Sequence, residues 1–166
     1  MEFNYLIVAA AALVPMVVGF IWYNPKVFGT AWMNVAGMTE EKIKGGNMPV
    51  IFLVSYVLSF LLAMATAGMV IHQMSVQSLF FAQEGFMEGS GAAYDQFTAL
   101  MEQFEGVHRT FGHGVLHGVI GGFFVALPIL GTNAMFERKG FKYIAVNCGY
   151  WIVTLGLMGG VLCQWA

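Results

Sequence analysis

The chain has 166 residues, of which 58% are hydrophobic and only 10% are charged, and its formal net charge is −2. A soluble domain carries roughly 25% charged residues, so this composition excludes an ordinary water-soluble globular protein. The small net charge gives no reason to expect a nucleic-acid partner. The length suits one domain that covers residues 1–166.

Charged residues leave four long gaps in the sequence, and each gap is rich in Val, Ile, Leu, Phe, Met and Ala. A helix needs about 20 apolar residues to cross the hydrocarbon core of a bilayer. The sequence therefore predicts an all-α fold, a four-helix transmembrane bundle whose surroundings are the lipid bilayer. We place the spans near residues 4–24, 50–74, 112–133 and 143–164.

The connections carry further helices. Residues 28–36 are too apolar for a free loop, which predicts a short cytoplasmic helix at the membrane interface. Thr39 is the expected N-cap of a helical turn that follows it. In the long segment 75–111, apolar side chains repeat at helical spacing over 92–105. This pattern predicts an amphipathic helix that lies over the outer mouth of the bundle.

The basic residues predict the orientation. Lys and Arg concentrate in short cytoplasmic loops, and the loops 25–49 and 134–142 each hold three of them. The segment 75–111 holds only Arg109, together with five acidic residues. We therefore expect a multi-pass protein of the bacterial cytoplasmic (inner) membrane with both termini on the outer side.

Glycines recur at close intervals in the third and fourth spans. Small residues at such spacing let helix backbones approach closely in lipid. The approach could be packing within one chain or contact between subunits, so a homo-oligomer or a subunit of a membrane complex is an expected state. The glycines concerned are Gly114, Gly118, Gly122, Gly156 and Gly160.

The histidines all map near the outer face. His113 and His117 are spaced i, i+4 and project from one side of a helix, and His72 ends the second span at a similar depth. Imidazole is a common ligand for zinc and other metals, so these three residues form a candidate metal site. A haem held by two of them, a proton relay and ordinary hydrogen bonding are the alternatives.

Three asparagines gather toward the cytoplasmic ends of the spans, namely Asn24, Asn133 and Asn147. Buried amides need hydrogen-bond partners. They could line a polar pocket there, or they could cap helix ends and bridge neighbouring helices.

Several sequence blocks resemble one known family. The stretch 19–33 (GFIWYNPKVFGTAWM) and the later blocks 127–138 and 147–151 are similar, in order, to the bacterial membrane-protein family called domain of unknown function 1761. The elements 112–114 and 117–118 resemble a subgroup variant. The resemblance implies a four-span inner-membrane protein, and it transfers no activity and no site residues.

Three functions remain open. The leading hypothesis is a non-enzymatic membrane module that acts by self-association or within a larger complex. The alternatives are a small oligomeric transporter or channel, and a metal- or haem-binding protein that uses the outer histidines. The spans show no nucleophile–base pair and no paired carboxylates, so we do not expect an enzyme.

Overall fold

The computed structural model describes residues 3–166, and within that range the chain forms helices and no strand. The helices are α1 (Tyr5–Ala11), α2 (Val14–Trp22), η1 (Pro25–Gly29), α3 (Thr30–Ala36), α4 (Glu40–Lys44), α5 (Met48–Val70), α6 (His72–Ser78), α7 (Gly91–Phe104), α8 (Phe111–Gly121), η2 (Gly122–Ala126), α9 (Leu127–Phe136) and α10 (Phe141–Trp165). The two η segments are π-helical turns.

Four helical stretches are long and apolar enough to cross a membrane, as predicted. They are Tyr5–Trp22, Met48–Val70, Phe111–Phe136 and Phe141–Trp165. The helix of the second stretch ends at Val70, whereas the sequence predicted a span that continues to residue 74.

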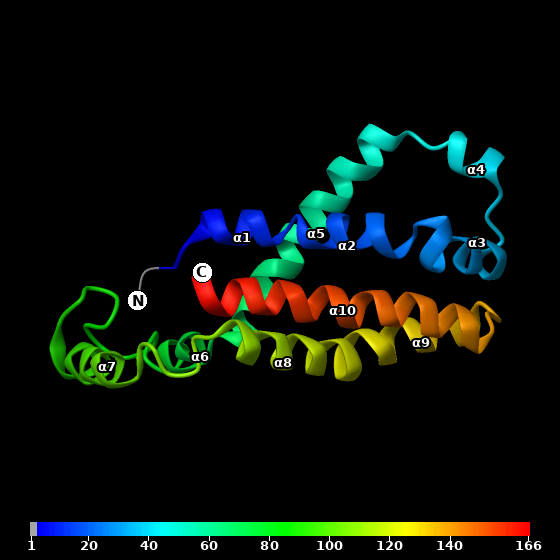
Figure 1. Cartoon of the computed structure of the whole chain (residues 1–166). Helices are drawn as coiled ribbons and strands as arrows, with labels where there is room; N and C mark the ends of the chain where they lie inside the picture. The colour runs from blue at the N-terminus through cyan, green and yellow to red at the C-terminus, as the bar shows by residue number, and fades with distance from the viewer. Residues whose placement is uncertain (1–2) are drawn as a thin grey trace.

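The last helix, α10, lies at the centre of the molecule. Figure 1 shows it between α1–α2 on one side and α8–α9 on the other, with α5 crossing obliquely behind. Half of the residues in its most apolar stretch are buried (50%), against 22% in α5. The N-terminal half of α5 leaves the other helices and runs toward α4, so its apolar side chains face outward.

Prolines shape two of the four stretches. Pro15 has no N–H to donate, and the first stretch is divided just before it into α1 and α2. Pro128 follows the π-helical turn η2, in which the N–H of Leu127 donates to the carbonyl of Gly122, five residues earlier. Such a turn inserts one extra residue into a helix without ending it. The third stretch therefore continues through α8, η2 and α9.

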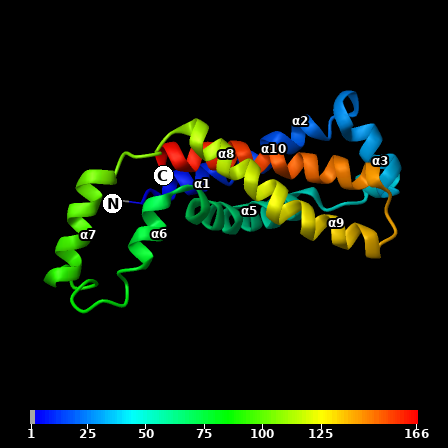
Figure 2. The ribbon, with the colours of Figure 1, turned by 90° about the horizontal axis from the view of Figure 1, so that it is seen from below.

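The two ends of the bundle differ in character. One end, which we call the basic end, carries α3, α4 and the turn 137–140. The opposite end, which we call the histidine end, carries α6, α7, the start of α8 and Ala166 (Figures 1 and 2). At the basic end, Trp22 Nε1 donates to the Val146 carbonyl at 3.1 Å and ties α2 to α10.

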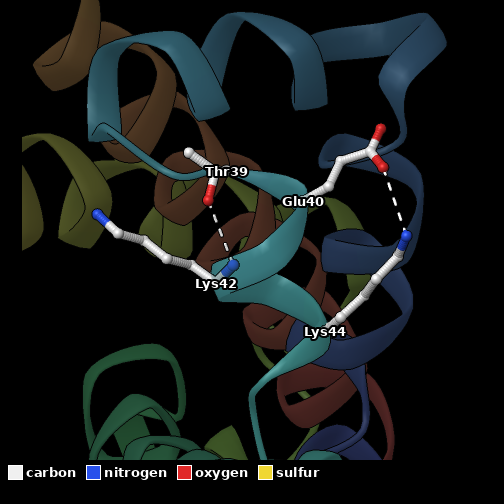
Figure 3. Close-up of polar contacts among 4 residues, drawn as sticks. All are labelled: Thr39, Glu40, Lys42 and Lys44. Atoms are coloured by element: carbon white, nitrogen blue, oxygen red, sulfur yellow. Dashed lines mark hydrogen bonds and ion pairs between the residues drawn. The ribbon is translucent and has the colours of Figure 1, made fainter.

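The predicted helical turn at Thr39 is present as α4. The Oγ1 of Thr39 accepts a hydrogen bond from the backbone N–H of Lys42 at 3.3 Å, which is the N-cap geometry expected from the sequence. Glu40 and Lys44 form an exposed i, i+4 ion pair of 3.5 Å on the same turn (Figure 3).

The predicted amphipathic helix is α7, but it does not lie over the mouth of the bundle. It projects beyond the histidine end and packs beside α6 (Figure 2). Its apolar face joins a small cluster of Phe86, Phe97 and Met101, which is separate from the main core. The main core lies near the same end and includes Ile71, Met158 and other residues of α1, α5 and α10.

Candidate metal centre

Two histidines face the same way from α8. Thr110 caps this helix, and its Oγ1 accepts a hydrogen bond from the backbone N–H of His113 at 3.3 Å. The cap sets the start of the helix, so His113 lies in the first turn and His117 follows one turn later on the same side. The centroids of their rings are 4.5 Å apart.

The third histidine reaches α8 because the helix before it stops. Ile71 follows α5 with an extended backbone, φ −103° and ψ 94°, and its side chain is fully buried. The helix α6 then starts at His72. The Nε2 atoms of His72 and His113 are 2.9 Å apart, which is a hydrogen-bond distance.

These three side chains form the geometry expected of a metal site. One ring nitrogen each from His72, His113 and His117 can be chosen so that all three atoms lie within 4.8 Å of one another. Nitrogens bound at about 2.0–2.1 Å to one tetrahedral zinc ion lie roughly 3.3 Å apart. Small rotations of half-buried side chains are enough to reach that spacing.

A fourth imidazole lies beside this group. The ring of His108 stacks on that of His113 with centroids 4.6 Å apart and planes inclined by 17°. Its centroid is 6.1 Å from that of His72. All four histidines of the chain therefore lie at one place at the histidine end.

The surroundings favour the neutral form of His72. Burial lowers the pKa of His72, and the nearby His117 and His108 lower this pKa further because each disfavours a second positive charge. Neutral imidazole is the form that binds metals. The three-residue group contains no carboxylate, so it suits Zn²⁺, Cu²⁺ or Ni²⁺ and not Mg²⁺ or Ca²⁺, which prefer oxygen ligands.

Two buried side chains hold the backbone around this group. The Nε2 of Gln73, a residue that is 5% exposed, donates to the carbonyls of Phe104 and Val107 at 2.8 and 2.9 Å. The Cys163 thiol on α10 lies 3.2 Å from the carbonyl oxygen of His108 and can donate to it. The connection between α7 and α8 is thereby fixed to α6 and α10.

A known protein family matches nearly the whole chain. A family model described as "Protein of unknown function (DUF1761)" matches residues 6–163. The chain belongs to this family. The matched range includes all four histidines and all four apolar stretches except their outermost residues. Searches of the curated proteins and of the solved structures found no match.

In this DUF1761 protein, the predicted packing glycines lie mainly between α8 and α10. A Cβ added at Gly118 would lie 2.6 Å from the carbonyl carbon of Leu155, and one at Gly122 would lie 2.7 Å from the Cα of Ile152. Gly114 faces the backbone of α10 in the same way, and Gly156 and Gly160 face Val119 and Phe111 of α8. The close helix approach is therefore made within one chain.

The three predicted asparagines differ in their hydrogen bonds and exposure. Asn24 accepts a hydrogen bond from the N–H of Lys26 at 2.9 Å and caps η1. Asn147 bridges to α2 by accepting from the Tyr23 hydroxyl at 3.3 Å. Asn133 is exposed on α9. Capping and bridging, one of the two predicted arrangements, describe the hydrogen bonds of Asn24 and Asn147, and a polar pocket formed by the three residues stays a prediction.

An apolar cavity of about 330 Å³ adjoins the candidate site. It lies between α5, the α8–α9 stretch and α10, and His117 is one of its lining residues. Most of the other lining residues, such as Leu62, Val125 and Leu155, are aliphatic. No sequence pattern predicts this cavity, because it depends on how α5 packs against the α8–α9 stretch and α10.

The contacts that Gln73 and Cys163 make with the backbone near the histidines were not predicted from the sequence. A glutamine directly after His72 in an apolar stretch is a signal that could have been used, since a buried amide requires partners. Cys163 carries no comparable signal, because a lone cysteine in an apolar helix reads as a small buried residue.

Proposed function

We propose that this DUF1761 protein is a membrane protein that binds a transition-metal ion, with His72, His113 and His117 as ligands. The observation that carries the proposal is the convergence of three imidazole nitrogens within 4.8 Å from two separate helices. A zinc ion is the best fit, since Zn²⁺ accepts imidazole nitrogens in tetrahedral sites. The proposal assigns binding and not a reaction, and the absence of enzymatic activity stays a prediction.

The packing beneath the histidines supports a preorganised site. His113 and His117 belong to α8, whose backbone is in close contact with α10 through Gly114 and Gly118. His72 directly follows Ile71, which is fully buried in the main core. Ligands held by packed elements lose little freedom when an ion binds, which favours affinity.

A single ion fits this geometry better than a haem does. Two axial histidines of a haem must lie on opposite faces of a wide flat macrocycle. The Nε2 atoms of His72 and His113 are in direct hydrogen-bond contact, which leaves no room for a macrocycle between them. A compact ion between converging nitrogens requires only that each imidazole is neutral and carries its ring proton on the nitrogen that does not bind the ion.

We further propose that the histidine end faces the outer side of a bacterial cytoplasmic membrane. The support is the placement of basic residues, because α4 and the turn 137–140 hold four of the seven Lys and Arg residues at the opposite end, and Lys142 at the start of α10 is a fifth. Positive residues favour the cytoplasmic side. The metal site would then be reached from outside the cell.

Self-association and transport stay predictions. The glycines that suggested a subunit interface lie in the contact between α8 and α10. They therefore support close packing within one chain. The outward apolar face of α5 is explained by contact with lipid. Neither observation favours an oligomer over a monomer, and metal binding has the more specific geometry.

The test is a zinc titration of the protein purified in detergent, followed by native mass spectrometry. We expect one ion per chain for the wild type. His113→Ala and His117→Ala should each weaken binding by more than the roughly 10- to 100-fold cost of losing a supporting residue around a metal. The control is Glu105→Gln, since Glu105 is exposed and outside the histidine group.

The expected control result is unchanged affinity and stoichiometry. A wild-type protein that binds no zinc, copper or nickel would remove the proposal. Equal loss of binding in the Glu105→Gln control would show that the ion sits on exposed acidic residues and not on the imidazoles.

A further inference from the structure

We propose that His108 is the fourth ligand of this metal centre and that it closes the site on the aqueous side. The inference rests on the proposed function. It changes what the centre can do, because four protein ligands make a closed tetrahedral site, whereas catalytic zinc sites keep one position for water. A closed site suits carrying or sensing an ion and does not suit hydrolysis.

The position of His108 is the first observation. Its ring lies 4.6 Å from that of His113 and 6.1 Å from that of His72. The other ring separations within the group, His72 to His113 and His72 to His117, are 5.0 and 4.8 Å. The fourth ring therefore borders the three-histidine group on the side of His113, outside the set of nitrogens that lie within 4.8 Å of one another. His108 is also exposed, so its ring is free to turn toward an ion.

The backbone of His108 is the second observation. Its φ is +62°, in the left-handed region that non-glycine residues rarely adopt. Among the described residues 3–166, Arg138 is the other non-glycine residue with a positive φ, at +56°. Non-glycine residues in this conformation need a local reason.

Arg138 has an ordinary reason. It follows the last residues of α9, and the N–H of Lys139 donates to the carbonyl of Ala134 at 2.8 Å. This bond belongs to the common left-handed ending of a helix. His108 ends no helix, since α7 stops at Phe104 and the cap of α8 is Thr110. Its conformation instead sets its ring over His113.

The surrounding hydrogen bonds are the third observation. Gln73 holds the carbonyls of Phe104 and Val107, just before His108. The Cys163 thiol and the N–H of Thr110 both approach the carbonyl of His108, at 3.2 and 2.9 Å. Bonds from α6, α8 and α10 thus fix the residue from three sides. Supporting shells of this kind orient metal ligands.

His108 is the most exposed of the four imidazoles. His72, His113 and His117 are half-buried, whereas His108 is exposed at the start of α8. We therefore expect an entering ion to meet His108 first and a leaving ion to lose His108 first. The residue is therefore expected to control the rate of release as well as the affinity.

The experiment measures zinc affinity and the rate of zinc release to a chelator for the full chain in detergent. His108→Asn is the main variant, because asparagine tolerates the left-handed backbone and lacks the imidazole. His108→Gly is the second variant, because glycine adopts a positive φ without steric cost. Arg138→Gly is the matched control, since it changes the other left-handed residue, far from the site.

We expect both His108 variants to keep one zinc per chain, to bind it about 10- to 100-fold more weakly and to release it faster. A cobalt-loaded His108→Asn protein should show the absorption change of a ligand replaced by water. Arg138→Gly should match the wild type in all three measurements. Wild-type affinity and release in both His108 variants would overturn the inference while the three-histidine site stands. A wild type without zinc binding would remove the proposed function itself.

Discussion

The contact between α8 and α10 gives a sharp quantitative test at Gly118. A Cβ at this position would lie 2.6 Å from the carbonyl carbon of Leu155 and 2.9 Å from the Cα of Gly156. Carbon atoms pack at about 3.5–4.0 Å, so Gly118→Ala would force the two helices apart by roughly 1 Å. The neighbouring atoms are backbone and cannot turn aside.

Overpacking of this kind typically costs about 1–3 kcal/mol. The assay is thermal unfolding in detergent, with and without zinc. We expect Gly118→Ala to melt below the wild type and to bind zinc more weakly, because His117 precedes Gly118 and moves with α8. Gly112→Ala is the control on the same helix, since a Cβ there meets nothing within 4 Å. Equal melting of the two variants would refute the close backbone approach.

Three further predictions concern the histidine end and α4. Gln73→Leu removes the bonds to the Phe104 and Val107 carbonyls, and we expect roughly tenfold weaker zinc binding in the same titration. Folding lowers the pKa of His72. As the pH falls through the ordinary histidine pKa of about 6.5, the unfolded chain therefore binds more protons than the folded chain does. Metal-free stability should therefore hold above that pH and fall below it in melting scans at pH 5–8. Thr39→Ala should cost α4 about 1 kcal/mol, seen as faster hydrogen exchange there, with zinc binding unchanged.

The sequence predicted the four apolar stretches because membrane insertion imposes a simple rule of length and composition. It predicted α10 as residues 143–164, and the helix covers Phe141–Trp165. The end of α5 was missed by four residues, because Ile71 carries no local breaking signal. Its extended backbone is set by burial in the core, which involves residues of α1 and α10.

The candidate site was predictable in part. The i, i+4 spacing placed His113 and His117 on one side of a helix, and the length of the second span placed His72 at a similar depth. The sequence placed His108 near this group, but its left-handed backbone could not be predicted, since the carbonyls of Val107 and His108 contact Gln73 and Cys163, which are 35 and 55 residues away from His108 along the chain. Contacts of that range are set by the tertiary fold.

The amphipathic helix shows the same limit. Its extent was predicted well, as 92–105 against Gly91–Phe104 for α7. Its position was not predicted correctly, because an apolar stripe shows which face of a helix is buried and does not show which segment covers that face. The partner turned out to be the nearby segment that includes Phe80 and Phe86.

The most direct test of the central claim is an X-ray absorption spectrum at the zinc edge of the zinc-loaded wild-type protein. The proposed centre predicts a first shell of nitrogen atoms only, at about 2.0–2.1 Å, with the outer-shell scattering of imidazole rings. A fit to four such rings would support His72, His113, His117 and His108 as the ligands, whereas three rings with one oxygen atom would support the three-histidine site without His108. A first shell dominated by sulfur or carboxylate oxygen, or a protein that retains no zinc, would contradict it.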